Sequence, residues 1–475
     1  MDDRAMKNKL KLIIWGAGRN LEKNIHRICL DNICCLIDCD TEKQRHGLCG
    51  INVYAPEKLS ELEYDYIVIS SELYFNEIAG LLLFTYGVEC KKILHWKGFL
   101  EEERIGEAAL RNSAKAFCSN YGICSVLDVG GILERNSFWN VGHELDMDLM
   151  ALDNTIYGFI KNRYRKASID VGDLSEDYDI LISGSVDVAE KWEQILRKSH
   201  HAILPFNSLY KIIPNGISAE NVDVFNYQGV HVAGICNKKK DVKIYQVTHK
   251  KFNPVNGNPY EPIHAGRQGK ADLGYLGDAV GDNISVLNDK INECTALYWI
   301  WKNDKTEYVG LNHYRRLFRS AVNREWMLQD FEVQVLLEQY DIIVAEAYDT
   351  GRLSVLESMR YQVCAEALDS TYNVLQDIFQ KRKKEDCRAF QYVMNGYMLY
   401  PCNMFITSRK IMEEYCEWLF PILLEMVEKV EIKEKWDDYS KRILGFFAER
   451  LLTVWIVQHD YKIKELPILF LDKTN

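Results

Sequence analysis

The sequence lacks the cysteine patterns of common metal-binding and disulfide-rich proteins. None of its 14 cysteines forms a CxxC pair, and the densest cluster, "CCLIDC", lies in an apolar run. A free thiol in such a run packs as a small hydrophobic group. Structural zinc sites space their ligands by two to four residues with a second pair nearby, so the cluster favours a core position over a metal site. The unpaired cysteines favour a reducing compartment, and we expect a cytoplasmic protein.

Long apolar runs, a leader and excess positive charge are missing as well. No window approaches the roughly 18 consecutive apolar residues of a membrane span, and the first residues lead into a strand without a signal peptide. The formal net charge of −11 argues against nucleic acid as a partner. We therefore expect at most peripheral contact with the inner face of the membrane. The basic run at 381–384 is better explained as a solvated helix end than as a headgroup contact.

The length of 475 residues predicts two or three domains. Residues 1–100 alternate strand and helix signals, which predicts a Rossmann-like parallel sheet. Residues 101–240 form a linking α/β region, and two assignments stay open: an extension of the first sheet or a second small unit. Three lysines at 238–240 suggest a linker. Residues 241–475 then begin a new α/β pattern that ends in long amphipathic helices, so the fold class is α/β throughout.

A glycine turn near the N-terminus resembles a dinucleotide-binding fingerprint. "GAGRNL" (Gly16 to Leu21) lies between a strand and a helix, and Asp38 follows at the end of the next strand, where a ribose would be bound. Leu21 replaces the small residue that permits close helix packing, which weakens the motif. We therefore favour a Rossmann-like turn without NAD(P). The rival is an NAD(P)-dependent sugar oxidoreductase or epimerase with "YGFIK" (Tyr157 to Lys161) as its proton relay.

A second polar region follows the strand at 242–248. This strand ends in Thr248 and His249, and a loop rich in Gly, Pro and Asn follows it. Loops longer than about 12–15 residues tend to be functional. The polar side chains of this loop would suit a uridine, a ribose, a pyrophosphate or a metal, although such residues also favour turns. They are His264, Arg267, Asp272, Asp278, Asp282 and Asn283.

The strand in "YVGLNHYRRLF" ends in four polar residues. They are His313, Tyr314, Arg315 and Arg316, and we expect them at the same sheet edge as Thr248 and His249. Paired arginines suit the diphosphate of a nucleotide-sugar. The alternative is that one arginine pairs with a structural carboxylate. Many transferases place an Asp-x-Asp metal motif at such a strand end, where this chain has "NHYR". A divalent metal, Mn or Mg, thus stays an open cofactor, with His313 as its candidate ligand.

The stretch from about Lys243 to the C-terminus resembles a bacterial family called domain-of-unknown-function family 4422. The motifs that carry the resemblance include "PIHAGRQ", "LGDAVGDNIS", "YVGLNHYRRLF", "CNMFIT" and "GFFAERLLTVWI". The resemblance implies a glycosyltransferase of the GT-A type, with a UDP-sugar donor and a glycan or lipid-linked glycan acceptor. It also implies capsular or exopolysaccharide biosynthesis, and some relatives look like galactofuranosyltransferases. The stretch from "GAGRN" to "APEKL" resembles Rossmann-like domains that accompany bacterial sugar-modifying enzymes.

An inverting transferase needs a general base, and four acidic residues are candidates. Asp437 and Asp438 lie in a break between two helices, Glu449 lies beside Arg450, and Asp349 follows a strand. Solvation is the more common explanation for the first pair, and an internal ion pair is the more common one for Glu449. Asn395 and Asn403 are candidates for binding acceptor hydroxyls. The sequence thus predicts a nucleotide-sugar-dependent hexosyltransferase, with a non-catalytic scaffold of a polysaccharide assembly complex as a further alternative.

Overall fold

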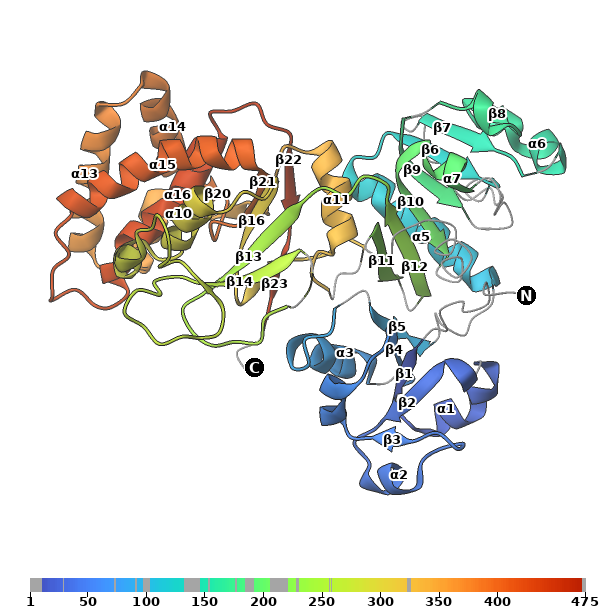
Figure 1. Cartoon of the computed structure of the whole chain (residues 1–475). Coiled ribbons are helices and arrows are strands. Elements are labelled where there is room, and N and C mark those ends of the chain that lie inside the picture. Colours follow the sequence, from blue (N-terminus) through green and yellow to red (C-terminus); the bar gives the residue numbers. More distant parts are fainter. Residues whose placement is uncertain are drawn as a thin grey trace.

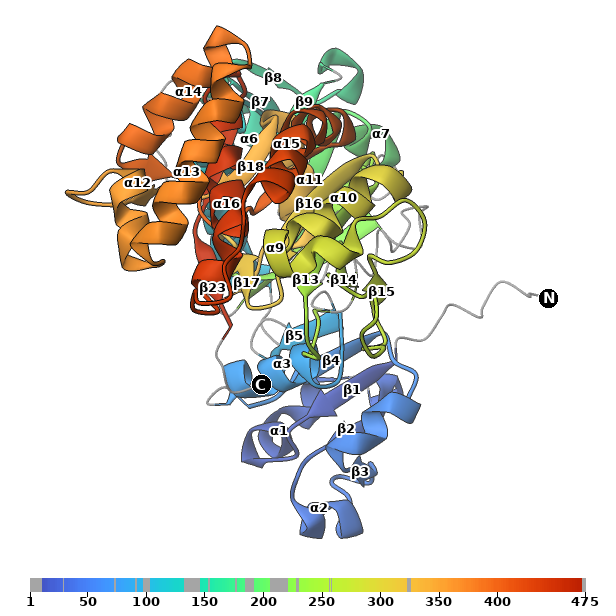
Figure 2. The same cartoon turned by 90° about the vertical axis from the view of Figure 1, so that its left-hand side faces the viewer.

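The computed structural model contains three α/β units that follow one another along the chain (Figure 1). In both views the first unit forms a lobe of its own below the other two (Figure 2). The structure describes residues 11–28, 30–71, 74–89, 92–96, 103–131, 146–152, 154–175, 177–183, 192–205, 221–227, 230–255, 257, 259–322 and 326–471.

The described residues of the first unit form a five-stranded sheet with the order β3-β2-β1-β4-β5. All of its neighbouring strands are parallel. Its strands are β1 (Leu12–Trp15), β2 (Ile33–Ile37), β3 (Val53–Tyr54), β4 (Tyr66–Ile69) and β5 (Ile93–His95), and its helices are α1 (Arg19–Asn24), α2 (Thr41–His46) and α3 (Phe75–Phe84). The predicted N-terminal parallel sheet is therefore confirmed.

The glycine turn after β1 is held by the carboxylate of Asp38, which follows β2. Gly16 has φ +105°, and a Cβ there would lie 2.6 Å from Ser70 Oγ, so only glycine fits. The Asp38 carboxylate accepts hydrogen bonds from the Ala17 backbone N–H at 2.7 Å and from Lys43 Nζ at 3.0 Å. The acid that would bind a ribose in a dinucleotide site thus already accepts from the glycine turn and from α2.

Residues 101–240 contain a sheet of their own, separate from the first sheet. Its described strands have the order β11-β12-β10-β9-β6-β7-β8, in which β10, β9, β6, β7 and β8 are parallel to one another and β12 is antiparallel to both β10 and β11. The strands are β6 (Ser125–Val129), β7 (Asp146–Met150), β8 (Lys166–Ser168), β9 (Tyr178–Ser183), β10 (Ser199–Pro205), β11 (Val222–Tyr227) and β12 (Val230–Cys236); the helices are α5 (Glu103–Tyr121), α6 (Asn154–Ile160) and α7 (Trp192–Leu196).

The third unit is built on a mixed sheet whose described strands have the central order β15-β14-β13-β16-β21-β18-β22. Strands β13 to β16 are parallel, and β21 lies antiparallel between β16 and β18. The strands are β13 (Val242–Thr248), β14 (Tyr260–His264), β15 (Leu276–Gly277), β16 (Tyr308–His313), β17 (Arg316–Phe318), β18 (Ile342–Ala345), β21 (Phe405–Ser408), β22 (Ile463–Leu466) and β23 (Ile468–Phe470), with β19 (Tyr348–Asp349) and β20 (Met398–Leu399) as a separate pair.

Helices cover this sheet and form the large lobe on the left of Figure 1. They are α9 (Asn288–Ile291), α10 (Cys294–Asn303), α11 (Asp330–Gln339), α12 (Val355–Ser358), α13 (Ala365–Gln380), α14 (Lys384–Asn395), α15 (Arg409–Lys429) and α16 (Ile443–Ile456). Helix α16 is buried along nearly its whole length against α14 and α15, so its first turn is held rigidly beside the sheet. None of the helices in the described part of the chain has the length and apolarity of a membrane span.

Helix α11 joins the second and third units (Figure 1). The three lysines do not form the free linker that the sequence suggests, because Lys239 and Lys240 make ion pairs with Asp330 and Glu338 of this helix. The Phe331 backbone N–H also donates to Asp223 of β11 at 2.6 Å. Charged and hydrogen-bonded contacts therefore fix the second unit on α11.

A buried carboxylate completes this junction. Glu332 of α11 accepts hydrogen bonds from the hydroxyls of Tyr121 and Ser320 and from the Gln329 backbone N–H. Burial raises its pKa. We expect Tyr121→Phe to lower the free energy of unfolding by about 1–3 kcal/mol, because it leaves a buried acceptor one donor short. Urea denaturation measures this; the exposed Tyr74→Phe is the control, and equal midpoints for the two variants would contradict it.

His201 makes the same junction sensitive to acid. The ring is buried against Phe331, near His200, Lys240, Glu338 and Asp179, and burial is the main cause that lowers its pKa to about 4. An unfolded histidine titrates near 6.5, so the stability from neutral His201 is present above pH 6.5 and is lost as the pH falls towards 4.

Between pH 6.5 and pH 4, His201 is expected to lower the free energy of unfolding by about 1.4 kcal/mol for each unit by which the pH falls. Urea denaturation between pH 7 and pH 4.5 measures it, with His201→Leu as the comparison. The variant should show a shallower fall in the free energy of unfolding than the wild type, and identical slopes would contradict the assignment to His201.

Candidate active site

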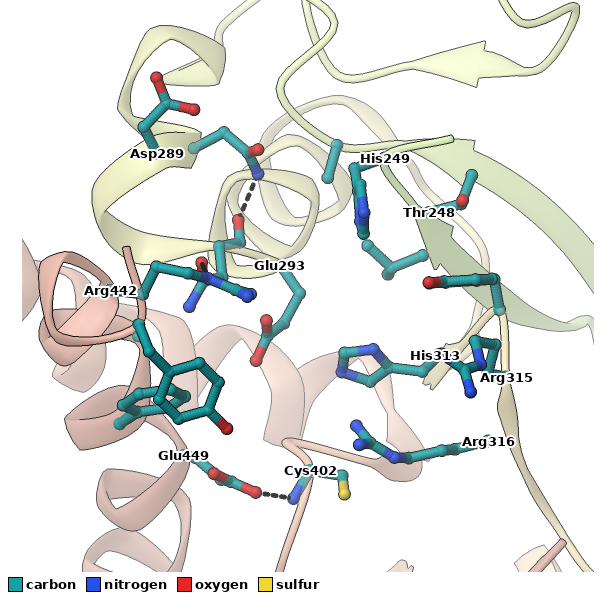
Figure 3. Close-up of a pocket in the computed structure, with 18 of the residues that line it drawn as sticks. Thr248, His249, Asp289, Glu293, His313, Arg315, Arg316, Cys402, Arg442 and Glu449 are labelled. Atoms are coloured by element: carbon teal, nitrogen blue, oxygen red, sulfur yellow. Dashed lines mark hydrogen bonds between the residues drawn. The ribbon is translucent and has the colours of Figure 1, made fainter. Parts of the chain in front are cut away.

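A cavity of about 1380 Å³ opens at the carboxyl ends of β13 and β16. Parallel strands end at one edge of the sheet there, where α/β proteins bind ligands. The opposite wall comes from α9, the segment before α16 and the first turns of α16 (Figure 3). Its polar lining includes Thr248, His249, Lys270, Asn292, Glu293, His313, Tyr314, Arg315, Arg316, Gln362, Asp438, Arg442 and Glu449.

Three arginines contribute positive charge to the cavity, which Lys270 and Lys441 also line. Arg315 and Arg316 follow β16, whereas Arg442 lies on the facing wall, where its Nε donates to Asn292 Oδ1 at 2.9 Å. None of the three forms an ion pair with a carboxylate in the described part of the chain, although other arginines, such as Arg409, do. Their guanidinium charges are therefore available to an anionic ligand.

His313 lies between these cations as a neutral ring. Burial is the main cause that lowers its pKa to about 4, and Arg316 and Arg442 lower it further against an opposing effect of Glu449. The imidazole is thus uncharged at neutral pH and offers one N–H donor and one acceptor nitrogen. Beside it, Tyr314 packs edge-on against His249, with ring centroids 5.7 Å apart.

Two of the carboxylates that line the cavity come from different helical segments, Glu293 just before α10 and Glu449 within α16 (Figure 3). Glu293 Oε1 accepts from Asn403 Nδ2 at 2.8 Å, and burial raises the pKa of Glu293. Glu449 accepts from the Cys402 backbone N–H and pairs with Arg450 Nη1 at 2.6 Å.

One backbone segment positions both acids. Cys402 and Asn403 have φ +71° and +49°, a conformation that costs free energy in residues other than glycine. The first of them donates its backbone N–H to Glu449, and the second donates its side-chain amide to Glu293. The strained pair thus orients both carboxylates towards the same space.

Gly445 leaves room for the group that holds Arg442. A Cβ at Gly445 would lie 1.8 Å from Asn292 Nδ2, and Asn292 itself has φ +51°. We expect Gly445→Ala to displace Asn292, to cost about 1–3 kcal/mol of stability through overpacking, and to weaken anion binding by Arg442. Thermal unfolding with and without UDP measures both effects.

The matched control for that change is Gly80→Ala in α3. A Cβ at Gly80 meets nothing within 4 Å, so alanine should stabilise the helix by about 0.5–1 kcal/mol. A Gly445→Ala protein as stable as the wild type, with an unchanged response to UDP, would contradict the packing described for Asn292.

The cavity contains six of the residues that the sequence predicts for donor binding. They are Thr248, His249, His313, Tyr314, Arg315 and Arg316. Asp278 is instead buried and closes the loop, accepting from the backbone N–H groups of Gly266 and Arg267 and from the Ser285 hydroxyl. The remaining donor candidates also lie outside the cavity lining: His264, Arg267, Asp282 and Asn283.

Local contacts explain where these outlying residues lie. Arg267 pairs with Asp272 at 3.4 Å, Asp282 accepts from the Tyr298 hydroxyl at 3.1 Å, and Asn283 forms a turn with Ser285. His264 is buried one strand from the cavity, paired in register with Thr248. A direct role for them in donor binding stays a prediction.

The acidic and amide candidates separate in the same way. Glu449 and Asp438 line the cavity, and the Asp438 side chain is fully exposed. Asp437 faces its own turn, where it accepts from Ser440 and Tyr439. Asp349 accepts from the Gly351 N–H in an exposed turn, and Asn395 is an exposed residue at the end of α14. Asn403 acts on the cavity through Glu293.

Glu293 and Arg442 are two of the cavity residues that the sequence reasoning missed. Both lie at helix starts and not at strand ends, which is where the strand pattern directs attention. The available signal for Glu293 was an acid among the apolar residues of "NECTALYWIW", and for Arg442 a cation in the first turn before "ILGFFAERLL".

The side chains of the cavity do not suit a divalent metal ion. The described residues contain no group of three His, Cys, Asp or Glu side chains placed to hold an ion. His313 lies next to the guanidinium groups of Arg316 and Arg442, which repel a cation. The cavity is chemically suited to an anion.

Family comparison adds an independent observation. Residues 243–460, which include the whole set of cavity residues named above, match the family model described as Domain of unknown function (DUF4422). The match lies in the C-terminal part of the chain and covers less than half of its full length. Residues 8–94 match a model described as C2185-like, N-terminal, and no curated protein matches the chain.

Solved structures show partial similarity to this DUF4422-containing chain. The apo structure of the bifunctional glycosyltransferase WbbM is 26% identical, covers 49% of this chain and 46% of its own, and has a TM-score of 0.42. A putative S-adenosyl-L-methionine-dependent methyltransferase from Methanococcus maripaludis is 12% identical over 29% of this chain and 89% of its own, with a TM-score of 0.20. The chain thus spans less than half of WbbM, and each TM-score lies below 0.5.

Proposed function

We propose that this chain is a glycosyltransferase that transfers a sugar from a UDP-sugar to a hydroxyl of a glycan or lipid-linked glycan. Galactofuranose is the first candidate for the sugar, and capsular or exopolysaccharide biosynthesis at the inner face of the membrane is the first candidate for the process. The observation that carries the proposal is the cavity at the ends of β13 and β16, where Arg315, Arg316 and Arg442 line the same space as Glu293 and Glu449. The resemblance to a family regarded as GT-A glycosyltransferases supports it.

The cations suit the leaving group of such a reaction. When the sugar–phosphate bond breaks, its electron pair goes to the UDP oxygen, and negative charge grows on the diphosphate. Arg316 and Arg442 approach the cavity from opposite walls and would stabilise this charge on two sides, with Arg315 beside them. Fixed donors in a partly buried site are worth more in the transition state than in water.

The carboxylates suit the acceptor half of the reaction. The acceptor oxygen forms a bond to the anomeric carbon as the bond to UDP breaks, and its proton must pass to a base. We assign this role to Glu449, which the Cys402 N–H and Arg450 hold in place. Glu293 lies deeper, towards His313, where its bond with Asn403 makes it a positioning group for the donor side.

Titration calorimetry tests the donor class. UDP should bind with heat release, GDP should bind more weakly, and NAD and NADP should not compete with UDP. Incubation with UDP-galactofuranose, UDP-galactose and UDP-glucose should then release UDP in the presence of an acceptor glycan. Binding of UDP without any release from these donors would support a scaffold, and NAD binding alone would place the ligand at the glycine turn.

A further inference from the structure

A second cavity, of about 430 Å³, adjoins the first one. The two share Gln362 and Glu449 in their linings, so the Glu449 carboxylate forms part of the wall between them. The volume of the second cavity falls within the roughly 300–1,000 Å³ of small-molecule sites. A ligand in the second cavity would therefore lie beside Glu449, the candidate base, and beside Arg450, which pairs with it.

The second cavity combines exposed aromatic rings with hydrogen-bonding groups. Tyr348 and Tyr361 line it and are 60% and 82% exposed. Gln362 accepts from Arg450 Nη2 at 3.3 Å, which leaves its amide NH₂ to donate to a ligand. A sugar ring has an apolar C–H face that packs on an aromatic ring and hydroxyls that need such polar partners.

The rings stand on a fixed segment. Tyr348 belongs to the β19–β20 pair, where it lies opposite Leu399. The Thr350 hydroxyl bonds the carbonyls of Leu353 and Tyr397, and the side chain of Ser354 caps α12, which leads directly to Tyr361. The two tyrosines are thus exposed on a braced surface.

We propose that the second cavity binds the acceptor end of a glycan chain, with sugar rings packed on Tyr361 and Tyr348. This inference rests on the proposed function. The acceptor hydroxyl meets Glu449 where the two cavities adjoin, and it gives its proton to that carboxylate. The hydroxyl oxygen then bonds the anomeric carbon of the donor held on the other side, and the electron pair of the broken bond leaves with UDP.

Saturation-transfer NMR on the full chain with UDP bound tests the assignment. The probes are trisaccharides of galactose, of glucose and of mannose. The wild type should transfer saturation to the ring protons of at least one of them. Tyr348→Ser with Tyr361→Ser should weaken that binding at least about tenfold, as truncation of exposed aromatic contact residues commonly does. Tyr392→Ser is the matched control, since Tyr392 is 73% exposed on α14 outside both cavities.

A second variant fills the cavity without removing the rings. Leu353→Trp should reduce trisaccharide binding to the same extent. Calorimetry on each variant should give a UDP dissociation constant within about twofold of the wild type, because the arginines are untouched.

The outcomes separate the two proposals. If UDP binds normally but no trisaccharide binds the wild type, or if the tyrosine and tryptophan variants bind it unchanged, the acceptor site is wrong and the donor site stands. If UDP fails to bind the wild type, the proposed function fails whatever the trisaccharides do. Equal loss in Tyr392→Ser would likewise overturn the assignment to the second cavity.

Discussion

Replacing Arg316 and Arg442 together by glutamine is expected to raise the dissociation constant of UDP by about 10²–10⁴. Each guanidinium would make a charge-assisted hydrogen bond with the diphosphate, worth about 1.5–3 kcal/mol. Glutamine keeps much of the length but removes the charge. Both side chains would contact the same diphosphate from opposite walls of the cavity, so each single variant is measured as well to determine how the two losses combine. Isothermal titration calorimetry at low ionic strength measures the effect.

The control for that variant removes two cations elsewhere. Arg45 and Arg197 are exposed, and each pairs with a nearby glutamate outside the cavity. Their replacement by glutamine changes the net charge by the same amount and should alter the UDP affinity by less than about twofold at moderate salt. A control that loses as much affinity as the cavity variant would contradict a local diphosphate site.

Glu449→Gln is expected to lower kcat by about 10²–10⁴, the usual range for loss of a general base. The amide can still accept from the Cys402 N–H, so the backbone around it should stay in place. The dissociation constant of UDP should change by less than about threefold, because Glu449 faces the acceptor side. Turnover is measured as UDP released from the active donor, with thermal unfolding as the check that the variant is folded.

Two further variants test that assignment against its competitors. Asp438→Asn changes a fully exposed acid that also lines the cavity, and it should leave kcat within about threefold. Glu293→Gln should act mainly on donor affinity, through its neighbours Asn403 and Arg442. A larger loss of kcat in either variant than in Glu449→Gln would move the base to that residue.

The strand-end part of the site was accessible from sequence because its chemistry follows a simple topological rule. Two apolar runs ended in polar residues, and parallel strands bring such ends to one edge. Register pairing bears this out, since Val247 lies opposite His313. The facing wall was not accessible, because Glu293 and Arg442 reach the cavity through helix packing that a local pattern does not encode.

In the polar loop, the sequence predicted ligand-binding residues that lie outside the cavity. Asp278 has the residue type of a ligand-binding group and lies in a long loop, yet it is fully buried and bonded to its own loop. The same chemistry that binds a ribose or a metal also replaces missing backbone partners in an irregular segment. Composition alone does not distinguish a ligand-binding acid from one that stabilises its own loop. The burial of the side chain and its hydrogen-bond partners do.

The sheets were predictable in kind and less so in their arrangement. Alternating strand and helix signals correctly indicated α/β units, but the strand order of residues 101–240 depends on long-range pairing. The lysines at 238–240 misled for a related reason. A run of charge is usually solvated, but here α11 presents Asp330 and Glu338 to it.

A crystal structure with UDP bound tests the central claim most directly. The account predicts the diphosphate at the ends of β13 and β16, with its oxygens within about 3 Å of the guanidinium nitrogens of Arg316 and Arg442. It also predicts the sugar-bearing side of the diphosphate directed towards Glu449. UDP bound anywhere else, at the "GAGRNL" turn or on the second unit, would contradict it.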